Sequence, residues 1–262
     1  MRCMTMNSSY LKLKENLGYL KLHQMTLHLD ETIDFMNRNE LSFIDTLIKL
    51  TGHEIDMKEI NMIRSMVRVA AFPHLKEVKD FDFEFQPSIN KEQILDFTTL
   101  RFIEQKENIV FLGSSGVGKT HLATSIGIAA AKKRTSTYFI KCHDLILNLK
   151  KAQVENRLET RLKHYRKYKL LIIDEIGYLP ISKEDAKLFF QLIDMRYEIR
   201  STIFTTNANF KSWGDIFQDP KIANAILDRV LHHASVINIV GDSYRLKNHF
   251  HSEEKSKVDM LK

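Results

Sequence analysis

The chain has 262 residues, 44% of them hydrophobic and 27% charged, which is enough for one α/β domain, a smaller appendage and a buried core. It has no apolar run near the roughly 18 residues of a membrane span, no apolar stretch typical of a secretory signal, and no cysteines at metal-ligand spacing. We therefore expect a cytoplasmic protein without membrane contacts, and its formal charge of +6 points to polyanionic partners.

The N-terminal part of the chain is predicted to be helical. Apolar residues recur at helical spacing around Leu17, from Phe43 to Leu50 and from Ile55 to Val69, which indicates three helices. Pro73 ends the last one, because proline cannot continue a helix. Residues 1–73 are predicted to form a helical module that packs on the main domain or contacts another subunit or partner.

A segment of alternating acidic and aromatic residues follows this module. Its sequence, DFDFEFQP at residues 80–87, is typical of a short extended leader or an edge strand. A helix over residues 91–100 is expected to come next.

The most informative stretch is a glycine-rich loop between an apolar strand-like run, residues 108–112, and a helix-like run, residues 121–133. It fits the pattern G-x-x-x-x-G-K-[ST], whose backbone N–H groups and helix N-terminus cradle phosphate oxygens. Lys119 would reach the β- and γ-phosphates and Thr120 would ligate Mg²⁺. A chance glycine-rich turn is the alternative. The predicted nucleotide-binding residues are Gly113, Ser114, Ser115, Gly116, Val117, Gly118, Lys119 and Thr120.

Further apolar runs predict four more strands, at residues 137–141, 170–174, 202–206 and 236–240. Helical stretches separate them. Five strands that alternate with helices predict an α/β fold with an open, parallel five-stranded sheet and helices on both faces. We assign this domain to residues 74–251, and the highly charged residues 252–262 to a frayed tail.

Two acids follow the third predicted strand, where ligands of open α/β sheets bind. Asp174 is the candidate for Mg²⁺, and Glu175 is the candidate to orient the attacking water. Asn207, after the next strand, could hydrogen-bond the γ-phosphate or that water. Arg229 and Arg245 are candidate cations for the charge that develops on the phosphoryl group. An ordinary strand that ends in an acidic turn is the alternative for the acidic pair.

Positive charge is concentrated in one stretch. Residues 132–169 contain 12 Lys or Arg against 3 Asp or Glu, a net charge of +9, whereas residues 1–80 are neutral. Such a stretch is typical of a polyanion-binding surface, although a solvated helix face would have the same composition.

Taken together, these motifs resemble the AAA+ ATPases of the IstB/DnaC group, and more specifically the IstB-like helper ATPases of insertion sequences. The resemblance covers nearly the whole chain. Its most specific motifs are GKTHLA, DEIGYLP, RYE and LDRVLHHA, and GDSYR follows them.

The resemblance implies a role for each candidate residue. It places Lys119 and Thr120 in Walker A, Asp174 and Glu175 in Walker B, Asn207 at sensor 1, Arg229 as an arginine finger acting on a neighbouring subunit, and Arg245 at sensor 2. About 17 residues follow Arg245, so we expect a minimal lid instead of a full helical lid domain.

The resemblance also implies that residues 144–169 line the DNA-facing side of an oligomer. The candidate DNA-binding residues there are Lys150, Lys151, Arg157, Arg161, Lys163, Arg166 and Lys167. No groove-reading motif is evident, so we expect contacts to the duplex DNA backbone without sequence specificity.

The leading functional hypothesis is an ATP- and Mg²⁺-dependent ATPase that oligomerises on DNA and presents it to a cognate transposase. One alternative is a replicative helicase loader of the DnaC type. Another is an interaction module that binds nucleotide but hydrolyses it negligibly.

Overall fold

The computed structural model describes residues 2–247 and, from residue 8 onward, their side chains. They form two compact units that divide between Ser65 and Met66, within one long helix. We call them the N-terminal unit and the C-terminal unit and describe each by itself. The sequence predicts the boundary after Pro73 instead, and the tail predicted for residues 252–262 lies outside the described residues.

The N-terminal unit is helical, and its last helix continues into the C-terminal unit. Its helices are α1 (Arg2–Tyr19), α2 (His23–Leu27), α3 (Leu29–Asn39) and α4 (Phe43–Val69). A small core of Leu17, Met25, Leu29 and Leu50 joins them. The Glu54 carboxylate on α4 accepts a hydrogen bond from the Gln24 N–H at 2.8 Å, which ties α4 to the start of α2.

Helix α4 is continuous where the sequence predicts two helices. Gly52 lies within it, but a glycine costs a helix only about 1 kcal/mol relative to alanine, and no proline interrupts the stretch. Of the apolar stripe predicted from Phe43 to Leu50, only Leu50 is buried. The side chains of Phe43 and Ile48 are 72% and 64% exposed.

The C-terminal unit is built on a five-stranded parallel sheet with the strand order β2-β3-β4-β1-β5. The strands are β1 (Asn108–Gly113), β2 (Thr137–Lys141), β3 (Leu170–Ile176), β4 (Ser201–Thr206) and β5 (Ala234–Ile239). The predicted open parallel sheet is confirmed, with strand ends within two residues of those expected.

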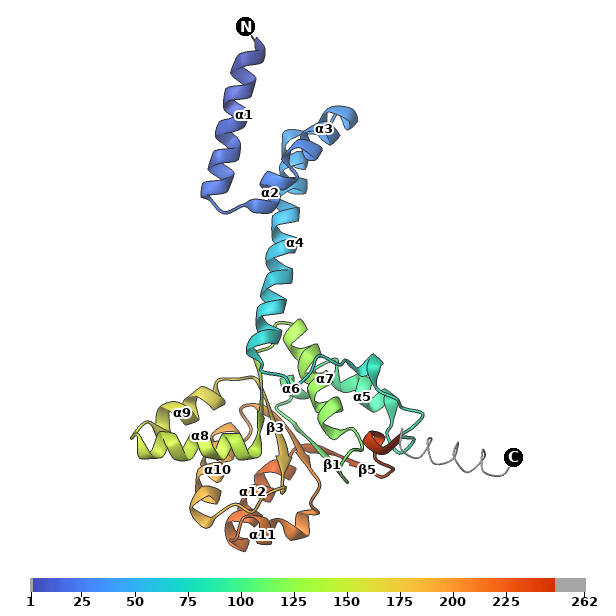
Figure 1. Ribbon diagram of the computed structural model, residues 1–262, viewed down its shortest axis with the longest axis vertical. Helices are drawn as coiled ribbons and strands as arrows, with labels where there is room; N and C mark the ends of the chain where they lie inside the picture. The colour runs from blue at the N-terminus through green and yellow to red at the C-terminus, as the bar shows by residue number, and fades with distance from the viewer. Residues whose placement is uncertain (1, 248–262) are drawn as a thin grey trace, which may run out of the picture. The chain divides into compact units, whose positions relative to one another are not determined.

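Helices cover both faces of this sheet (Figure 1). Successive strand residues point to opposite faces, so Ile109 and Phe111 pack on one side while Val110 packs on the other. The first face is covered by α5 (Lys91–Phe97), α6 (Arg101–Glu104) and α7 (Lys119–Lys132), and the second by α8 (Cys142–Val154), α9 (Leu158–Arg166), α10 (Lys183–Arg196), α11 (Trp213–Ile216) and α12 (Pro220–Leu231).

The segment at residues 80–87 is neither an edge strand nor regularly extended. A short 3₁₀ helix, η1 (Val78–Asp80), leads into turns, one of which is closed by a hydrogen bond from the Phe85 N–H to Asp82. Phe81 and Phe83 both pack against the α7 side of the core. The aromatic residues therefore cover a helix instead of alternating across a sheet edge.

The helix predicted over residues 91–100 is also shorter than expected. Helix α5 ends at Phe97, and Leu100 adopts a left-handed conformation with a φ of 75° before α6 begins. Leu100 is buried, so packing of its side chain stabilises this turn.

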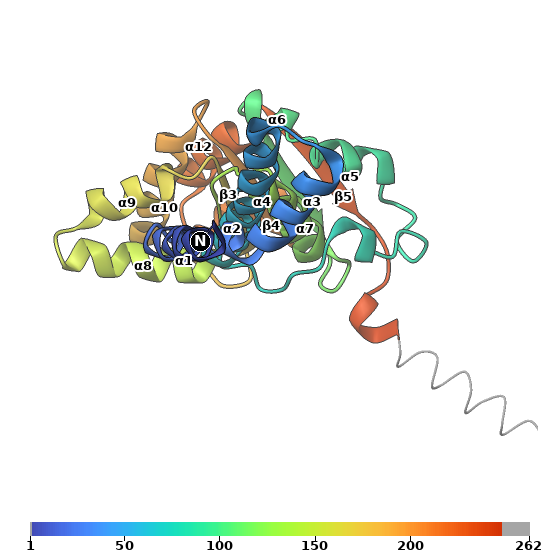
Figure 2. The ribbon, with the colours of Figure 1, turned by 90° about the horizontal axis from the view of Figure 1, so that it is seen from above.

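The basic stretch forms two helices, α8 and α9, which project from one edge of the C-terminal unit (Figure 2). Buried Arg196 at the end of α10 anchors them, since its guanidinium donates to the backbone carbonyls of Tyr165 and Tyr168 at 2.9 Å each. The same side chain donates to Thr202 Oγ1 and to the Ser201 carbonyl on β4. Burial lowers the pKa of Arg196 to about 9, so the cation persists at neutral pH among these oxygen acceptors.

Within residues 2–247, every helix is too short or too polar to span a lipid bilayer.

Candidate functional site

A cavity of about 540 Å³ lies at the carboxyl ends of the central strands. The loop between β1 and α7 forms its floor, and the ends of β3 and β4 form one wall. Ten of the thirteen residues predicted for the nucleotide site line it, namely Ser115, Gly116, Val117, Gly118, Lys119, Thr120, Asp174, Glu175, Asn207 and Arg245. Segments far apart in the sequence therefore converge here, as expected for an open α/β sheet.

The loop depends on glycines at two positions with positive φ. Gly116 has a φ of 86°, and Gly118, which directly precedes α7, has a φ of 100°. A Cβ at Gly118 would lie 2.5 Å from Cε2 of Phe81, and one at Gly116 would overlap the Ser243 side chain. Other residues are therefore excluded at both positions by backbone strain and by close neighbours.

Lys119 extends from the first turn of α7 back along the loop. Its Nζ donates to the Gly113 carbonyl at 2.8 Å and to the Ser114 carbonyl at 2.7 Å. Burial lowers the pKa of Lys119, the negative charge of Asp174 raises it, and the positive charge of Arg245 lowers it further. The loop thus presents a partly desolvated ammonium to the cavity.

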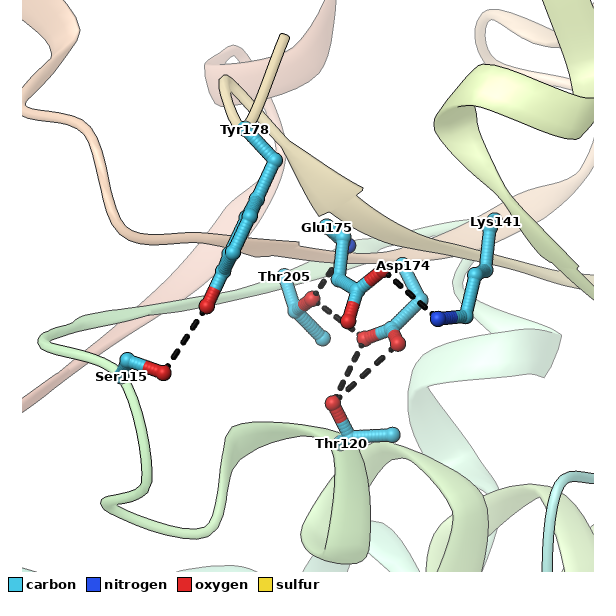
Figure 3. Close-up of polar contacts among 7 residues, drawn as sticks. All are labelled: Ser115, Thr120, Lys141, Asp174, Glu175, Tyr178 and Thr205. Carbon is cyan, nitrogen blue, oxygen red and sulfur yellow. Dashed lines mark hydrogen bonds and ion pairs between the residues drawn. The ribbon is translucent and has the colours of Figure 1, made fainter. Parts of the chain in front are cut away.

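A buried carboxylate joins the loop to two strands (Figure 3). Asp174 at the end of β3 is 1% exposed and accepts hydrogen bonds from Thr120 Oγ1 at 2.9 and 3.1 Å and from Thr205 Oγ1 at 2.5 Å. Burial raises the pKa of Asp174, and the two hydroxyl donors oppose that shift. The Thr120 hydroxyl and the Asp174 carboxylate are adjacent hard oxygen donors, the ligand type that suits Mg²⁺.

Glu175 faces the cavity beside this carboxylate. Its Oε2 lies 2.9 Å from Nζ of Lys141 at the end of β2, and this interaction raises the pKa of Lys141. Glu175 has a φ of 62°, rare for a non-glycine residue, and its N–H donates to Thr205 Oγ1 at 2.9 Å. The strained conformation turns the two adjacent carboxylates toward one cavity.

Three residues of this site were missed by sequence reasoning. Thr205 donates to Asp174, Lys141 pairs with Glu175, and the Tyr178 hydroxyl donates to Ser115 Oγ at 2.8 Å (Figure 3). Lys141 and Thr205 follow apolar runs at the carboxyl ends of strands next to β3, which is the signal that could have identified them.

The opposite wall of the cavity combines residues 73–86 with residues 240–247. Lys247 pairs with Asp82 at 2.7 Å, and Gln86 Nε2 donates to the Asp242 carbonyl at 2.7 Å. The Tyr244 N–H donates to the Gly116 carbonyl at 3.0 Å, so this wall is bonded directly to the loop. No motif in the sequence predicts a site residue within residues 73–86.

Asn207 and Arg245 both line this cavity. Asn207 is exposed directly after β4 and lines the cavity. Arg245 is exposed in the short helix η3 (Tyr244–Leu246) and is close enough to influence Lys119 electrostatically. Both residues therefore line the cavity formed by the chain to which they belong.

A family model described as IstB-like ATP binding protein matches residues 15–252. The chain belongs to this family. One relative comes from insertion sequence IS232 of Bacillus thuringiensis subsp. berliner, and its name proposes that it binds ATP. It is 75% identical and aligns over 95% of this chain and 99% of its own length. A similarly named relative from IS5376 of Geobacillus stearothermophilus is 39% identical over 94% of this chain and 98% of its own length.

Solved structures confirm the fold that the resemblance implied. The crystal structure of the DnaC helicase loader is 27% identical, with a TM-score of 0.51 over 57% of this chain and 88% of that chain. The replication initiator DnaA bound to AMPPCP and single-stranded DNA is 16% identical, with a TM-score of 0.57 over 71% of this chain and 56% of that chain. The C-terminal unit of this IstB-like protein is an AAA+ P-loop domain.

In this IstB-like chain, Arg229 does not line the cavity of its own subunit. Its Nε donates to Asp194 Oδ1 at 2.7 Å, and one terminal nitrogen donates to the Ala225 carbonyl at 3.2 Å. The guanidinium also lies 4.7 Å from the centre of the Phe190 ring. Arg229 is thus held between α10 and α12, away from the other candidate catalytic residues.

The seven candidate DNA-binding residues differ in how they are engaged. Lys150 pairs with Asp185 at 3.2 Å, Arg157 with Glu155, and Lys163 with Glu159 at 2.6 Å. Arg166 donates to the Met195 carbonyl, and Lys167 lies over the Tyr168 ring. Lys151 on α8 is exposed, and Arg161 on α9 is half-buried. The charge of this stretch is therefore partly neutralised within the protein.

Replacing Gly118 should destabilise the protein. We expect Gly118→Ala to lower the free energy of unfolding by about 1–3 kcal/mol, because the new residue would be strained and would displace Phe81. Gly214→Ala is the matched control, since its Cβ would meet Pro220 at 3.7 Å in helix α11. It should be neutral or stabilising by up to about 1 kcal/mol. Urea unfolding measures both, and equal effects would contradict this account.

Proposed function

We propose that this protein is an ATP-hydrolysing helper of DNA transposition that oligomerises on duplex DNA and presents it to a transposase. The observation that carries the proposal is the convergence of Lys119, Thr120, Asp174 and Glu175 on one cavity. Phosphoryl transfer to water requires a phosphate cradle, an oxygen site for the metal ion and a carboxylate beside the attacking water. Relatives named for ATP binding in insertion sequences support the biological context.

The loop of residues 113–120 would hold the triphosphate. Its backbone N–H groups and the N-terminus of α7 favour negative charge, and Lys119 would exchange its two carbonyl acceptors for phosphate oxygens. Thr120 and Asp174 would hold Mg²⁺. When bound, the ion would neutralise charge on the β- and γ-phosphate oxygens.

Glu175 is the proposed residue that orients the attacking water, and Asn207 would hold the same water or the γ-phosphate. The ion pair with Lys141 holds the Glu175 carboxylate at the carboxyl ends of the strands. Thr205 fixes the Glu175 backbone, so the carboxylate approaches from a defined direction. These contacts support hydrolysis over simple nucleotide binding.

Arg229 is the proposed arginine finger for a neighbouring subunit. Its position outside its own cavity supports a role in trans, and such a role requires an oligomer. To reach another subunit's nucleotide, the side chain would have to leave Asp194.

The α8–α9 pair is the proposed DNA-binding surface. Lys151 and Arg161 are the strongest candidates there, because five of the seven basic residues engage acids, a carbonyl or a ring. Contacts of this kind neutralise phosphates and carry no sequence information.

The similarity to the DnaC helicase loader favours one alternative, a replicative helicase loader. Gene neighbourhood separates the two functions: an adjacent transposase gene supports transposition, and adjacent replication genes support helicase loading. Pull-down with the ATP-bound protein on DNA gives the biochemical answer, since either a transposase or a replicative helicase should be retained.

Glu175→Gln should separate nucleotide binding from hydrolysis. We expect ATP affinity within a few-fold of wild type but turnover lower by about 100-fold or more, since the water would lose its carboxylate. Lys119→Ala should lose ATP binding itself, and the exposed Glu92→Gln on α5 should behave as wild type. Fluorescent ATP titration and phosphate release, each with and without duplex DNA, give these values. Absence of wild-type turnover in both conditions would favour the non-hydrolysing module.

Mixing two inactive variants should restore activity if Arg229 acts in trans. Lys119→Ala subunits would supply the finger, and Arg229→Ala subunits would supply the nucleotide site. We expect phosphate release from the mixture to exceed the sum of the separate variants and to depend on protein concentration. Normal turnover by Arg229→Ala alone, or no gain on mixing, would refute the shared site.

DNA binding should weaken as salt increases. Each phosphate contact contributes about 0.9 to the slope of log affinity against log salt, so Lys151→Ala with Arg161→Ala should reduce the slope by about 1.8. Lys211→Ala with Lys221→Ala, which removes two positive charges outside this surface, is the charge-matched control. Fluorescence anisotropy with random-sequence duplexes measures the slope, and an unchanged slope in the double variant would exclude this surface.

A further inference from the structure

Two motifs carried by the sequence, RYE and LDRVLHHA, contribute side chains that the nucleotide site does not use. Tyr197 and Glu198 follow the end of α10, and His232 and His233 follow the end of α12. Helices α10 and α12 pack together, so the four side chains meet at one surface point of the C-terminal unit.

The cluster brings ligand atoms within the spacing of a metal site. Oε1 of Glu198 lies 3.4 Å from Nε2 of His233 and 3.8 Å from Nδ1 of His232. One ligand atom from each of the three residues lies within 4.8 Å of the other two. Zinc bonds of about 2.0–2.1 Å at tetrahedral angles separate neighbouring ligand atoms by about 3.3 Å. Small side-chain rotations would therefore bring all three to one ion.

We propose that Glu198, His232 and His233 form a binding site for a divalent transition-metal ion of the zinc type. Two imidazoles and one carboxylate are a ligand set for zinc and disfavour Mg²⁺, which prefers oxygen ligands only. All three side chains are exposed, so water would complete the coordination. The site is separate from the oxygen donors at Asp174.

The surroundings hold these ligands in place. The Tyr197 hydroxyl lies 2.6 Å from Nδ1 of His232, and the two imidazole rings are 3.9 Å apart. Glu198 has a φ of 55°, a conformation rare outside glycine, which directs its carboxylate toward the histidines. Arg196, buried just before this turn, fixes the backbone from which Tyr197 and Glu198 extend.

An ordinary surface cluster of ion pairs and ring contacts would also satisfy these groups. That explanation needs no metal and predicts no change on adding one. The Tyr197 hydroxyl would then keep its contact with His232, whereas metal binding at Nδ1 would displace the hydroxyl or recruit it as a further ligand.

A bound ion would cross-link the carboxyl ends of α10 and α12. Arg229 lies in the last turn of α12, three residues before His232, so the same ion would fix the end of the helix that carries it. This link to catalysis rests on the proposed function of Arg229, but the metal site itself does not.

The test uses the untagged, full-length protein, stripped with a chelator and free of nucleotide, in millimolar Mg²⁺. Isothermal titration with Zn²⁺ and the visible spectrum with Co²⁺ report affinity and geometry. We expect Glu198→Gln, or His232→Ala with His233→Ala, to weaken one Zn²⁺ site at least tenfold and to remove the Co²⁺ band. Zn²⁺ should also raise the melting temperature of wild type more than that of either variant.

The control is His28→Ala with His53→Ala, which removes a stacked histidine pair of the N-terminal unit. It should retain wild-type Zn²⁺ affinity, and circular dichroism should show every variant folded. The proposal fails if wild type binds no Zn²⁺ at tens of micromolar, if the cluster variants bind equally well, or if the control loses the site. ATP turnover is not part of the test, so failure of the ATPase proposal would leave the result interpretable.

Discussion

The buried carboxylate of Asp174 is the contact on which the rest of the site depends. A carboxylate that is 1% exposed is costly unless donors surround it, and here the donors come from the start of α7 and the end of β4. The same Thr205 hydroxyl that donates to Asp174 accepts the N–H of Glu175. One hydrogen-bond network therefore joins the loop, strands β3 and β4, and both acids. Their relative positions are set by the hydrogen bonds of the folded chain.

Much of this arrangement could be predicted from local patterns. The glycine-rich loop lies between an apolar strand and a helix, and Asp174 and Glu175 end a buried strand. The sequence therefore predicts both the phosphate-binding chemistry and the edge of the sheet at which these residues lie. The contributions of Thr205 and Lys141 were not predicted, because each acts on β3 from a neighbouring strand. The strand predicted for residues 80–87 was wrong. Their alternating acidic and aromatic residues resemble a strand, but Phe81 packs against Gly118. Counting charges likewise could not show that Lys150 would meet Asp185, which lies on another helix.

The candidate catalytic groups fall into two sets. Lys119, Asp174, Glu175, Asn207 and Arg245 face one cavity, and Arg229 lies apart, held by Asp194 and the Phe190 ring. Arg229 is paired with an acid of its own chain and does not line that chain's cavity. This position fits the proposal that Arg229 acts on another molecule. The proposed action of Arg229 on a neighbouring subunit accounts for this separation.

Arg196 gives the C-terminal unit a mechanical property. Its guanidinium joins the backbone at the end of α9 to the first residues of β4, and the other end of this short strand carries Thr205. Strand β4 is hydrogen-bonded to β3 on one side and to β1 on the other, so it resists bending. It therefore forms a rigid connection between the basic helices and the pair Asp174 and Glu175. Displacing the end of α9 from β4 would therefore require breaking the hydrogen bonds of Arg196, at one end of the strand that supports Asp174 at the other.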